Sequence, residues 1–178
     1  KWVRSSVRIA TLHYVISDVQ KEDYDKAFKV NNKILTKFGD FSGNAELKNK
    51  FNKPLQIVYT GNIGLNRWKS LAIIVEALRK ININGTQAEL KIYTTNEITE
   101  KIRKTLEVPG TSQIMGKAPA CEMPSIQKAA DILVHVESFD LKNRLTVRQS
   151  FSTKIVDYLK RGRAILAIGP SEVASIKH

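Results

Sequence analysis

The sequence has 178 residues, of which 42% are apolar and 26% are charged, and its formal net charge is +12. This length suits one medium domain, or one domain with part of another, and no apolar run approaches the roughly 20 residues of a membrane-spanning helix. The single cysteine, Cys121, excludes an internal disulfide and a CxxC metal motif. The three histidines of the sequence, His13, His135 and His178, are too far apart along the chain for a zinc cluster. The positive charge indicates acidic partners: phosphorylated small molecules, nucleic acid or anionic lipid.

Residues 1–43 are predicted to be a small remnant of one domain. The expected elements are, in chain order, a weak helix over 1–13, a strand over 14–16, a helix from residue 17 to about 30 and a strand over 33–38. Residues 17–20, Ser-Asp-Val-Gln, fit a capping box that begins the second helix. That helix is expected to bury Tyr24, Ala27 and Phe28. We assign residues 44–53, which are mostly polar, to a linker.

From Pro54 onward, strand-like and helix-like segments alternate. The expected strands cover 55–60, 88–93, 112–115, 132–136 and 164–168. The helices between them are expected to begin at caps formed by Asn66, Asn96 and Ser152, and a short one at Pro124. Residues 137–149 are predicted to be a charged loop. This alternation predicts an α/β domain over 54–178 with a doubly wound, Rossmann-like parallel sheet.

The stretch from residue 150 to 170 carries the clearest local pattern. After Ser152, the residues Ile155, Tyr158 and Leu159 fall at helical spacing and predict the buried face of a helix. Gly162 can adopt the left-handed conformation that ends a helix. The following apolar run, 164–168, is typical of a strand that is covered on both faces.

One residue of that helix has an unfavourable position. Lys154 lies in the first turn, where the free N–H groups already make the helix end positive. Arg67 and Lys69 repeat this pattern in the helix that begins after Asn66. Because ligands of open α/β sheets bind at the carboxyl ends of the strands, the two helix ends are expected to bind one diphosphate through these cations and their N–H groups. The alternative is that all three cations are solvated surface charges.

Two carboxylates are expected at the same edge of the sheet. Asp157, one turn after Lys154, either accepts hydrogen bonds from ribose hydroxyls or pairs with a cation on its own helix. Glu137 directly follows the strand 132–136. The turn at 61–64 is Gly-Asn-Ile-Gly, and the sequence contains neither GxGxxG nor a P-loop motif, so these two nucleotide-binding classes are unsupported.

Several of these segments resemble the retaining glycosyltransferase family 4, whose members have the GT-B fold. The resemblance covers most of residues 14–178. It rests on YTGNIGLNRWKSL (59–71), MGK (115–117), ADILV (130–134), ESF (137–139) and FSTKIVDYLKRGRAIL (151–166), and on VISDVQKEDY (15–24) for the end of the N-terminal domain. The chain departs from the family pattern at Asn62, where arginine is usual, at Asp157, where glutamate is usual, at Ala164, where proline is usual, and by an insertion over 140–150.

The resemblance implies that 54–178 is a donor domain, truncated at its C-terminal end, which binds a nucleotide diphosphate sugar. The implied donor-binding residues are Gly61, Asn62, Arg67, Lys69, Gly116, Lys117, Ser152, Thr153, Lys154 and Asp157. Glu137 is the implied catalytic candidate, near the donor sugar and phosphate. Residues 1–43 would then be what remains of the acceptor domain.

The resemblance further implies an enzyme that transfers a hexose-like sugar from UDP-sugar or GDP-sugar to a hydroxyl, with retention, in polysaccharide or glycolipid synthesis. We expect no cofactor and no metal ion. We expect a part of a longer cytoplasmic protein, inactive alone, whose further partners are a lipid-linked acceptor and an anionic membrane surface. Two alternatives stay open: a nucleotide-binding module without transfer activity and, from the charge of +12, a basic nucleic-acid-binding domain.

Overall fold

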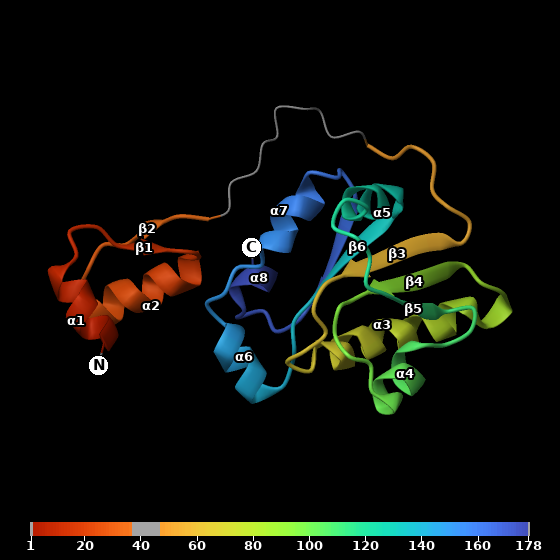
Figure 1. Cartoon of the computed structure of the whole chain (residues 1–178), viewed down its shortest axis with the longest axis horizontal. Coiled ribbons are helices and arrows are strands. Elements are labelled where there is room, and N and C mark those ends of the chain that lie inside the picture. The colour runs from red at the N-terminus through yellow and green to blue at the C-terminus, as the bar shows by residue number, and fades with distance from the viewer. Residues whose placement is uncertain (1, 37–46, 178) are drawn as a thin grey trace.

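A computed structural model of the chain describes residues 2–36 and 47–177. The larger part is a five-stranded sheet in which every pairing is parallel (Figure 1). Its strand order is β5-β4-β3-β6-β7. The strands are β3 (Leu55–Thr60), β4 (Ala88–Tyr93), β5 (Ser112–Gly116), β6 (Ile132–Val136) and β7 (Ala164–Ile168). The predicted α/β class and parallel sheet are therefore confirmed.

Helices cover both faces of this sheet (Figure 1). The helices of this larger part are α3 (Arg67–Ile81), α4 (Glu100–Leu106), α5 (Met123–Ala129), α6 (Leu141–Val147), α7 (Thr153–Leu159) and α8 (Ala174–Lys177), with a 3₁₀ turn at Asn82–Asn84; α3 packs on one face of the sheet and α7 on the other. The order of the strands reverses between β3 and β6, which are neighbours in the sheet. The loops after these two strands diverge to opposite sides, which leaves a crevice at their carboxyl ends.

Two apolar clusters hold the layers together. The larger one joins α3 to one face of the sheet, where Leu71, Leu90 and Ile92 are fully buried. The smaller one lies on the other face and includes Leu133 of β6 and Tyr158 of α7. Helical spacing on α3 and alternation on β4 generate these faces, as the sequence pattern predicts.

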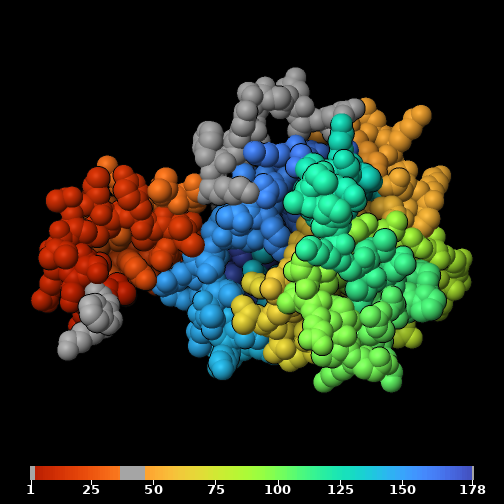
Figure 2. Space-filling view, in the orientation of Figure 1, coloured from red at the N-terminus to blue at the C-terminus, as the bar shows by residue number. Residues whose placement is uncertain are grey.

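The N-terminal unit contains α1 (Trp2–Ile9), β1 (Tyr14–Val15), α2 (Asp18–Phe28) and β2 (Lys33–Ile34), and β1 and β2 pair in parallel. Ser17 caps α2 by accepting a hydrogen bond from the Gln20 N–H, as predicted. The unit lies beside the chain segment between α6 and α7 (Figure 2). Ser17 Oγ donates to the Gln149 carbonyl over 2.6 Å, and Asp23 accepts hydrogen bonds from the side chains of Arg148 and Gln149.

The buried face predicted for α2 is only partly correct. Val19 is its buried apolar residue, whereas Ala27 is exposed. Tyr24 and Phe28 are half-buried and pack edge to face at 5.2 Å between ring centroids. The predicted strand over 33–38 is shorter than expected, and its positions 37–38, like 44–46 of the predicted linker, lie outside the described residues.

The predicted cap at Asn96 is wrong. Thr99 caps α4 by accepting from the Ile102 N–H. Asn96 instead accepts a hydrogen bond from the Ile63 N–H over 2.8 Å, and so links the end of β4 to the loop after β3. Because this contact joins residues that are far apart in the sequence, local capping rules do not reveal it.

The prediction of a loop over 137–149 is also wrong, because α6 lies within it. Val147 is the buried residue of α6, while Leu141 and Leu145 are exposed. Two of its leucines thus face outward, which removes the apolar stripe by which a helix is recognised in a sequence.

The last helix and strand follow the prediction in part. Ile155 and Tyr158 are buried, but Leu159 is 47% exposed and Val156 takes its place on the buried face. Gly162 has the expected left-handed conformation, with φ of 60°. The strand β7 lies at the edge of the sheet. Ile165 packs against one apolar cluster and Leu166 and Ile168 against the other, but Ala164 and Ala167 are exposed, so both faces of β7 are covered only in part.

A buried carboxylate fastens the segment before β3 to the start of β6. Asp131 accepts hydrogen bonds from the Gln56 N–H at 2.7 Å and from Asn52, and pairs with Lys48 Nζ at 2.6 Å. Burial by itself would raise the pKa of Asp131, but the hydrogen bonds from Lys48, Gln56 and Asn52 outweigh it and the pKa is lowered.

Replacing Asp131 by Ala is expected to lower the free energy of unfolding by about 3 kcal/mol, because it leaves several buried donors without an acceptor. Urea unfolding near pH 7 measures this loss. The loss should shrink as the pH falls below the ordinary aspartate pKa, since stability from a lowered carboxyl pKa disappears on protonation. Glu76→Ala, at an exposed ion pair of α3, is the control and should change stability little. Equal losses in the two variants would contradict this account.

Candidate functional site

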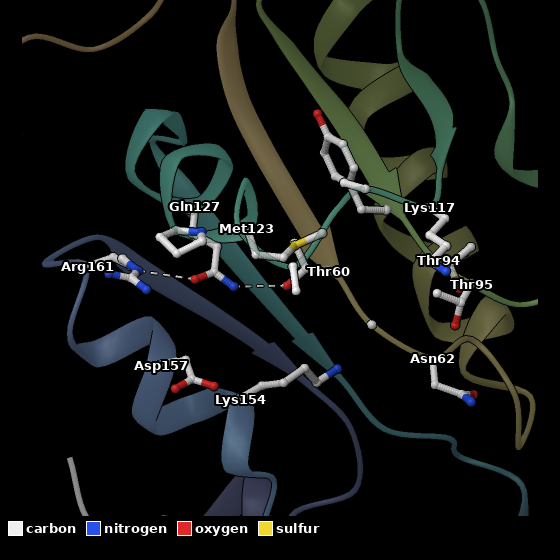
Figure 3. A pocket seen from close by; sticks show the side chains of 15 residues that line it. Thr60, Asn62, Thr94, Thr95, Lys117, Met123, Gln127, Lys154, Asp157 and Arg161 are labelled. Carbon is white, nitrogen blue, oxygen red and sulfur yellow. Dashed lines mark hydrogen bonds between the residues drawn. The ribbon is translucent and has the colours of Figure 1, made fainter.

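Two adjoining cavities lie at the carboxyl ends of the strands. The first has a volume of about 440 Å³ and lies between the loop after β3, the segment before α5 and the helix α7 (Figure 3). The second has a volume of about 300 Å³ and lies between α3, the end of β6 and the segment before α7. Asn62 and Lys154 line both of them. The two side chains therefore mark the point where the cavities meet.

The loop after β3 is shaped so that Lys154 can cross it. Gly61 has φ of 153°, and a Cβ atom there would lie 2.2 Å from Lys154 Nζ. The Tyr59 hydroxyl donates to the Asn62 carbonyl over 2.7 Å, which fixes the loop against its own strand. A larger residue at position 61 would have to adopt this strained φ and would displace the end of the lysine side chain.

Lys154 extends from the first turn of α7 toward this loop (Figure 3). Its Nζ lies 4.8 Å from the centroid of the Tyr59 ring, a cation–π contact. Burial, and then the positive charge of Arg67, lower the pKa of Lys154 to about 8, while Glu137 opposes the shift. A partly desolvated ammonium near a second cation is the kind of perturbed ionisable group that is common at functional sites.

Arg67 and Glu137 form a two-pronged ion pair in the second cavity. Arg67 Nε lies 2.9 Å from Glu137 Oε2 and Nη2 lies 3.2 Å from Oε1. Ser70 Oγ donates to the Glu137 carbonyl over 2.7 Å. The carboxylate is thus held by α3, although it belongs to the end of β6.

The N-terminus of α3 differs from the prediction. Asn66 adopts a left-handed conformation and makes no side-chain capping bond; its Nδ2 donates to Asp140 instead. The first N–H groups of the helix bond to loop carbonyls: Arg67 to Gly64, Trp68 to Ile63 and Lys69 to Asn66. These N–H groups are therefore occupied, and the expectation that they bind an anion is wrong. What α3 contributes to the crevice is the Arg67 side chain.

A hydrogen-bonded row of side chains forms one wall of the first cavity (Figure 3). Arg161 Nε donates to Gln127 Oε1 over 3.2 Å, and Gln127 Nε2 donates to Thr60 Oγ1 over 3.3 Å. The buried Tyr158 hydroxyl lies 3.0 Å from the same Thr60 oxygen. Asp157 also lines this cavity, on the same helix as Lys154.

Thr60, Gln127 and Arg161 were not predicted from the sequence. Gln127 carries no signal in the sequence, because its burial in α5 becomes visible only in the structure. Arg161 lies one turn after Asp157, near the end of its helix, where a cation fits the local pattern without any role in a site.

The predicted site residues divide into three groups. Gly61, Asn62, Lys117, Lys154 and Asp157 line the first cavity, and Asn62, Arg67, Glu137, Ser152 and Lys154 line the second. The remaining three line neither cavity: Gly116 ends β5, Thr153 is exposed, and Lys69 pairs with Asp140 at 3.0 Å. Ser152 is at the N-cap of α7 but makes no side-chain capping bond.

Within residues 2–36 and 47–177, no group of three or more His, Cys, Asp and Glu side chains is arranged to hold a metal ion. In the same ranges, none of the helices combines the length and the apolar character that a membrane span requires.

No protein-family model and no curated protein sequence matches the chain. Solved structures do match it. A structure of TarM has a TM-score of 0.64 and 16% identity, over 97% of this chain and 33% of TarM. A mutant of S. aureus TarM, in complex with Fondaparinux, alpha-GlcNAc-glycerol and UDP, has a TM-score of 0.62 and 14% identity, over 96% and 33%. The pneumococcal O-GlcNAc transferase GtfA, in complex with UDP and GlcNAc, has a TM-score of 0.62 and 14% identity, over 94% and 32%.

These similarities show that the chain shares the GT-B glycosyltransferase fold with its structural neighbours. The chain spans about a third of the length of each solved structure that it matches. Identities of this size show the fold alone.

Replacing Lys154 by Met is expected to stabilise the protein near pH 7, because the substitution removes a partly desolvated cation and keeps the volume of its stem. The lowered pKa of Lys154 means that its destabilising effect is complete below about pH 8 and disappears as the pH rises toward the ordinary lysine pKa. Urea unfolding of both proteins at about pH 7 and about pH 9.5 should therefore show a difference that narrows at the higher pH. A constant difference would show that Lys154 titrates normally.

Proposed function

We propose that this chain is the donor-binding part of a glycosyltransferase and that its crevice binds a nucleotide diphosphate sugar. The observation that carries the proposal is the position of Lys154. Its side chain passes over Gly61 and places a partly desolvated ammonium where the two cavities meet. An anion at this point would gain a charge-assisted hydrogen bond and would relieve the repulsion between Lys154 and Arg67.

The two cavities offer different surroundings to the two ends of such a donor. The first contains Asp157, a carboxylate suited to ribose hydroxyls, and Lys117 beside the space left for a base. The second contains Glu137 and Arg67, and takes the sugar and the distal phosphate. The diphosphate then lies between them, at Asn62 and Lys154.

This arrangement supports sugar transfer by electrostatic stabilisation of the leaving group. When the bond between the sugar and the diphosphate breaks, negative charge develops on the phosphate oxygen, and Lys154 and Arg67 lie where they would stabilise it. Side-chain cations supply the charge that a divalent ion supplies in other transferases, and we therefore propose a reaction without a metal ion. Retention of configuration and a role in polysaccharide or glycolipid synthesis belong to the same proposal, through the family 4 resemblance.

UDP is the first nucleotide to test. Both the S. aureus TarM mutant and pneumococcal GtfA were solved with UDP, and each shares the fold of this chain. GDP is the second, because the cavity walls on their own do not select a base.

In calorimetric titrations, UDP or GDP is expected to bind. Lys154→Met should weaken binding about tenfold or more, because it removes a charge-assisted contact with the diphosphate. Asp157→Asn should weaken it about tenfold if ribose hydroxyls donate to the carboxylate. Lys104→Ala, which removes an exposed cation on α4, is the control for net charge and should leave the affinity unchanged. Affinity should also fall as the pH rises through about 8, because Lys154 then loses its proton.

Equal effects of Lys154→Met and Lys104→Ala would contradict the donor site. Binding to any duplex or single-stranded DNA that falls steeply with salt, together with no nucleotide binding, would favour the nucleic-acid alternative. Nucleotide binding without transfer by the longer protein would favour a non-catalytic module.

The chain alone is expected not to transfer sugar, since it spans about a third of its structural neighbours. An assay of UDP release from UDP-sugars, with and without soluble acceptors, tests this. Turnover by the chain above the rate of the Lys154→Met variant would show that it contains a complete active site.

A further inference from the structure

His135 is a buried ionisable residue that the proposed donor contacts do not use. It lies in β6 and is 1% exposed. Side chains two residues apart on a strand point to the same face, so His135 lies beside Glu137. Its Nε2 is 3.1 Å from Ser175 Oγ and 3.6 Å from Glu137 Oε1, while its Nδ1 is buried without a hydrogen-bond partner among the described residues.

These contacts determine which ring nitrogen carries the proton. With hydrogen on Nε2, the N–H donates to Ser175 Oγ, and the Glu137 carboxylate, 3.6 Å from Nε2 and beyond hydrogen-bond distance, faces the positive end of the ring dipole, so an unpaired Nδ1 acceptor is the one cost. With hydrogen on Nδ1, a buried donor would be unpaired, and the Nε2 lone pair would face a carboxylate oxygen. The first tautomer is therefore favoured.

The surroundings also keep the ring uncharged. Burial, followed by the charges of Lys154 and Arg67, lowers the pKa of His135 to about 4. The charged and polar groups that face it are Glu137 on its own strand, Arg67 from α3, Lys154 from α7 and Ser175 from α8. The imidazole therefore acts near pH 7 as a neutral donor.

The helix α8 is packed closely enough to hold this arrangement. A Cβ atom at Gly169 would lie 2.9 Å from Ile176 Cγ1 and 3.0 Å from Glu137 Cβ. Ser175, the neighbour of Ile176, is buried. A continuous set of contacts thus runs from Ser175 through His135 and Glu137 to Arg67 in the second cavity.

We propose that His135 is a positioning residue: Ser175 accepts its Nε2–H and so turns the positive end of the ring dipole toward the Glu137 carboxylate, which favours the position of that carboxylate against Arg67 over one near Lys154. Lys154 is then left for the diphosphate. In the ion pairs that the described residues form, Glu137 pairs with Arg67 and not with Lys154, as this role requires. The proposal rests on the proposed function for its ligand, but its geometry can be tested without one.

The first test is NMR spectroscopy of the chain without nucleotide. The nitrogen resonances of the His135 ring should show the neutral Nε2–H tautomer between about pH 5.5 and pH 8. In His135→Leu, the released Glu137 should turn toward Lys154 and raise its pKa, so that the side-chain resonances of Lys154 titrate at a higher pH. His135→Gln keeps an amide donor and should restore the wild-type titration. Ser175→Ala should shift it in the same direction as His135→Leu, by less.

The second test is UDP affinity near pH 7. His135→Leu should weaken binding about tenfold, because the released carboxylate competes with the diphosphate for the cations, and His135→Gln should stay within about threefold of the wild type. Val136→Ala, a buried substitution on the opposite face of β6, controls for general destabilisation, and His13→Gln controls for the loss of a histidine elsewhere. Neither control should move the affinity or the Lys154 titration.

An Nδ1–H or charged ring near pH 7 would overturn the proposal. So would an unchanged Lys154 titration in His135→Leu and in Ser175→Ala, with both variants folded. If neither UDP nor GDP binds the wild-type chain, the proposed function fails, while the tautomer and the Lys154 titration still decide whether His135 positions Glu137.

Discussion

The crevice depends on one unfavourable placement, a lysine ammonium held at the start of a helix, partly out of water and near a second cation. The fold accommodates it with a glycine at position 61, which leaves room for the side chain, and with the face of the Tyr59 ring, which partly replaces the lost water. An interior group of this kind lowers stability unless a ligand neutralises it. Functional sites commonly retain such groups, because ligand binding neutralises the charge and so recovers the free energy that its burial costs the free protein.

The arrangement of the other charges follows from this placement. The one carboxylate in the second cavity, among the residues that line it, pairs with Arg67 through two hydrogen bonds. Glu137 is further held through its backbone by Ser70 and approached by the neutral His135. The reversal of strand order between β3 and β6 brings these groups together, since Arg67 and Ser70 belong to α3, which follows β3, while His135 lies in β6 and Glu137 directly follows it.

The sequence predicts the elements of the sheet well because each has a strong local signal. The strands 55–60, 88–93 and 132–136 alternate or are continuously apolar, and the structure places β3, β4 and β6 over the same residues. Lys154 was identified because a cation in a first helical turn contradicts a local electrostatic rule, and the structure places it in the crevice.

What the sequence could not reveal depends on contacts between distant residues. Asn66 and Asn96 have the composition of helix caps, yet each side chain bonds across the fold, to Asp140 and to Ile63. In the sequence, His135 is one more residue of a buried strand. Its contact with Ser175, which is 40 positions away in the sequence, appears only in the structure. The helix α6 escaped prediction because two of its leucines face outward, and a sequence pattern cannot distinguish them from apolar residues in a loop.

The most direct test of the donor site is the affinity of the chain for UDP, measured by calorimetry as a function of pH for the wild type and for Lys154→Met. The account predicts that the wild type binds UDP, and that its affinity falls through a midpoint near the pKa of about 8. The variant should bind weakly and without that midpoint. Wild-type binding that is independent of pH between about 7 and 9, or equal in the two proteins, would contradict the claim that Lys154 binds the diphosphate.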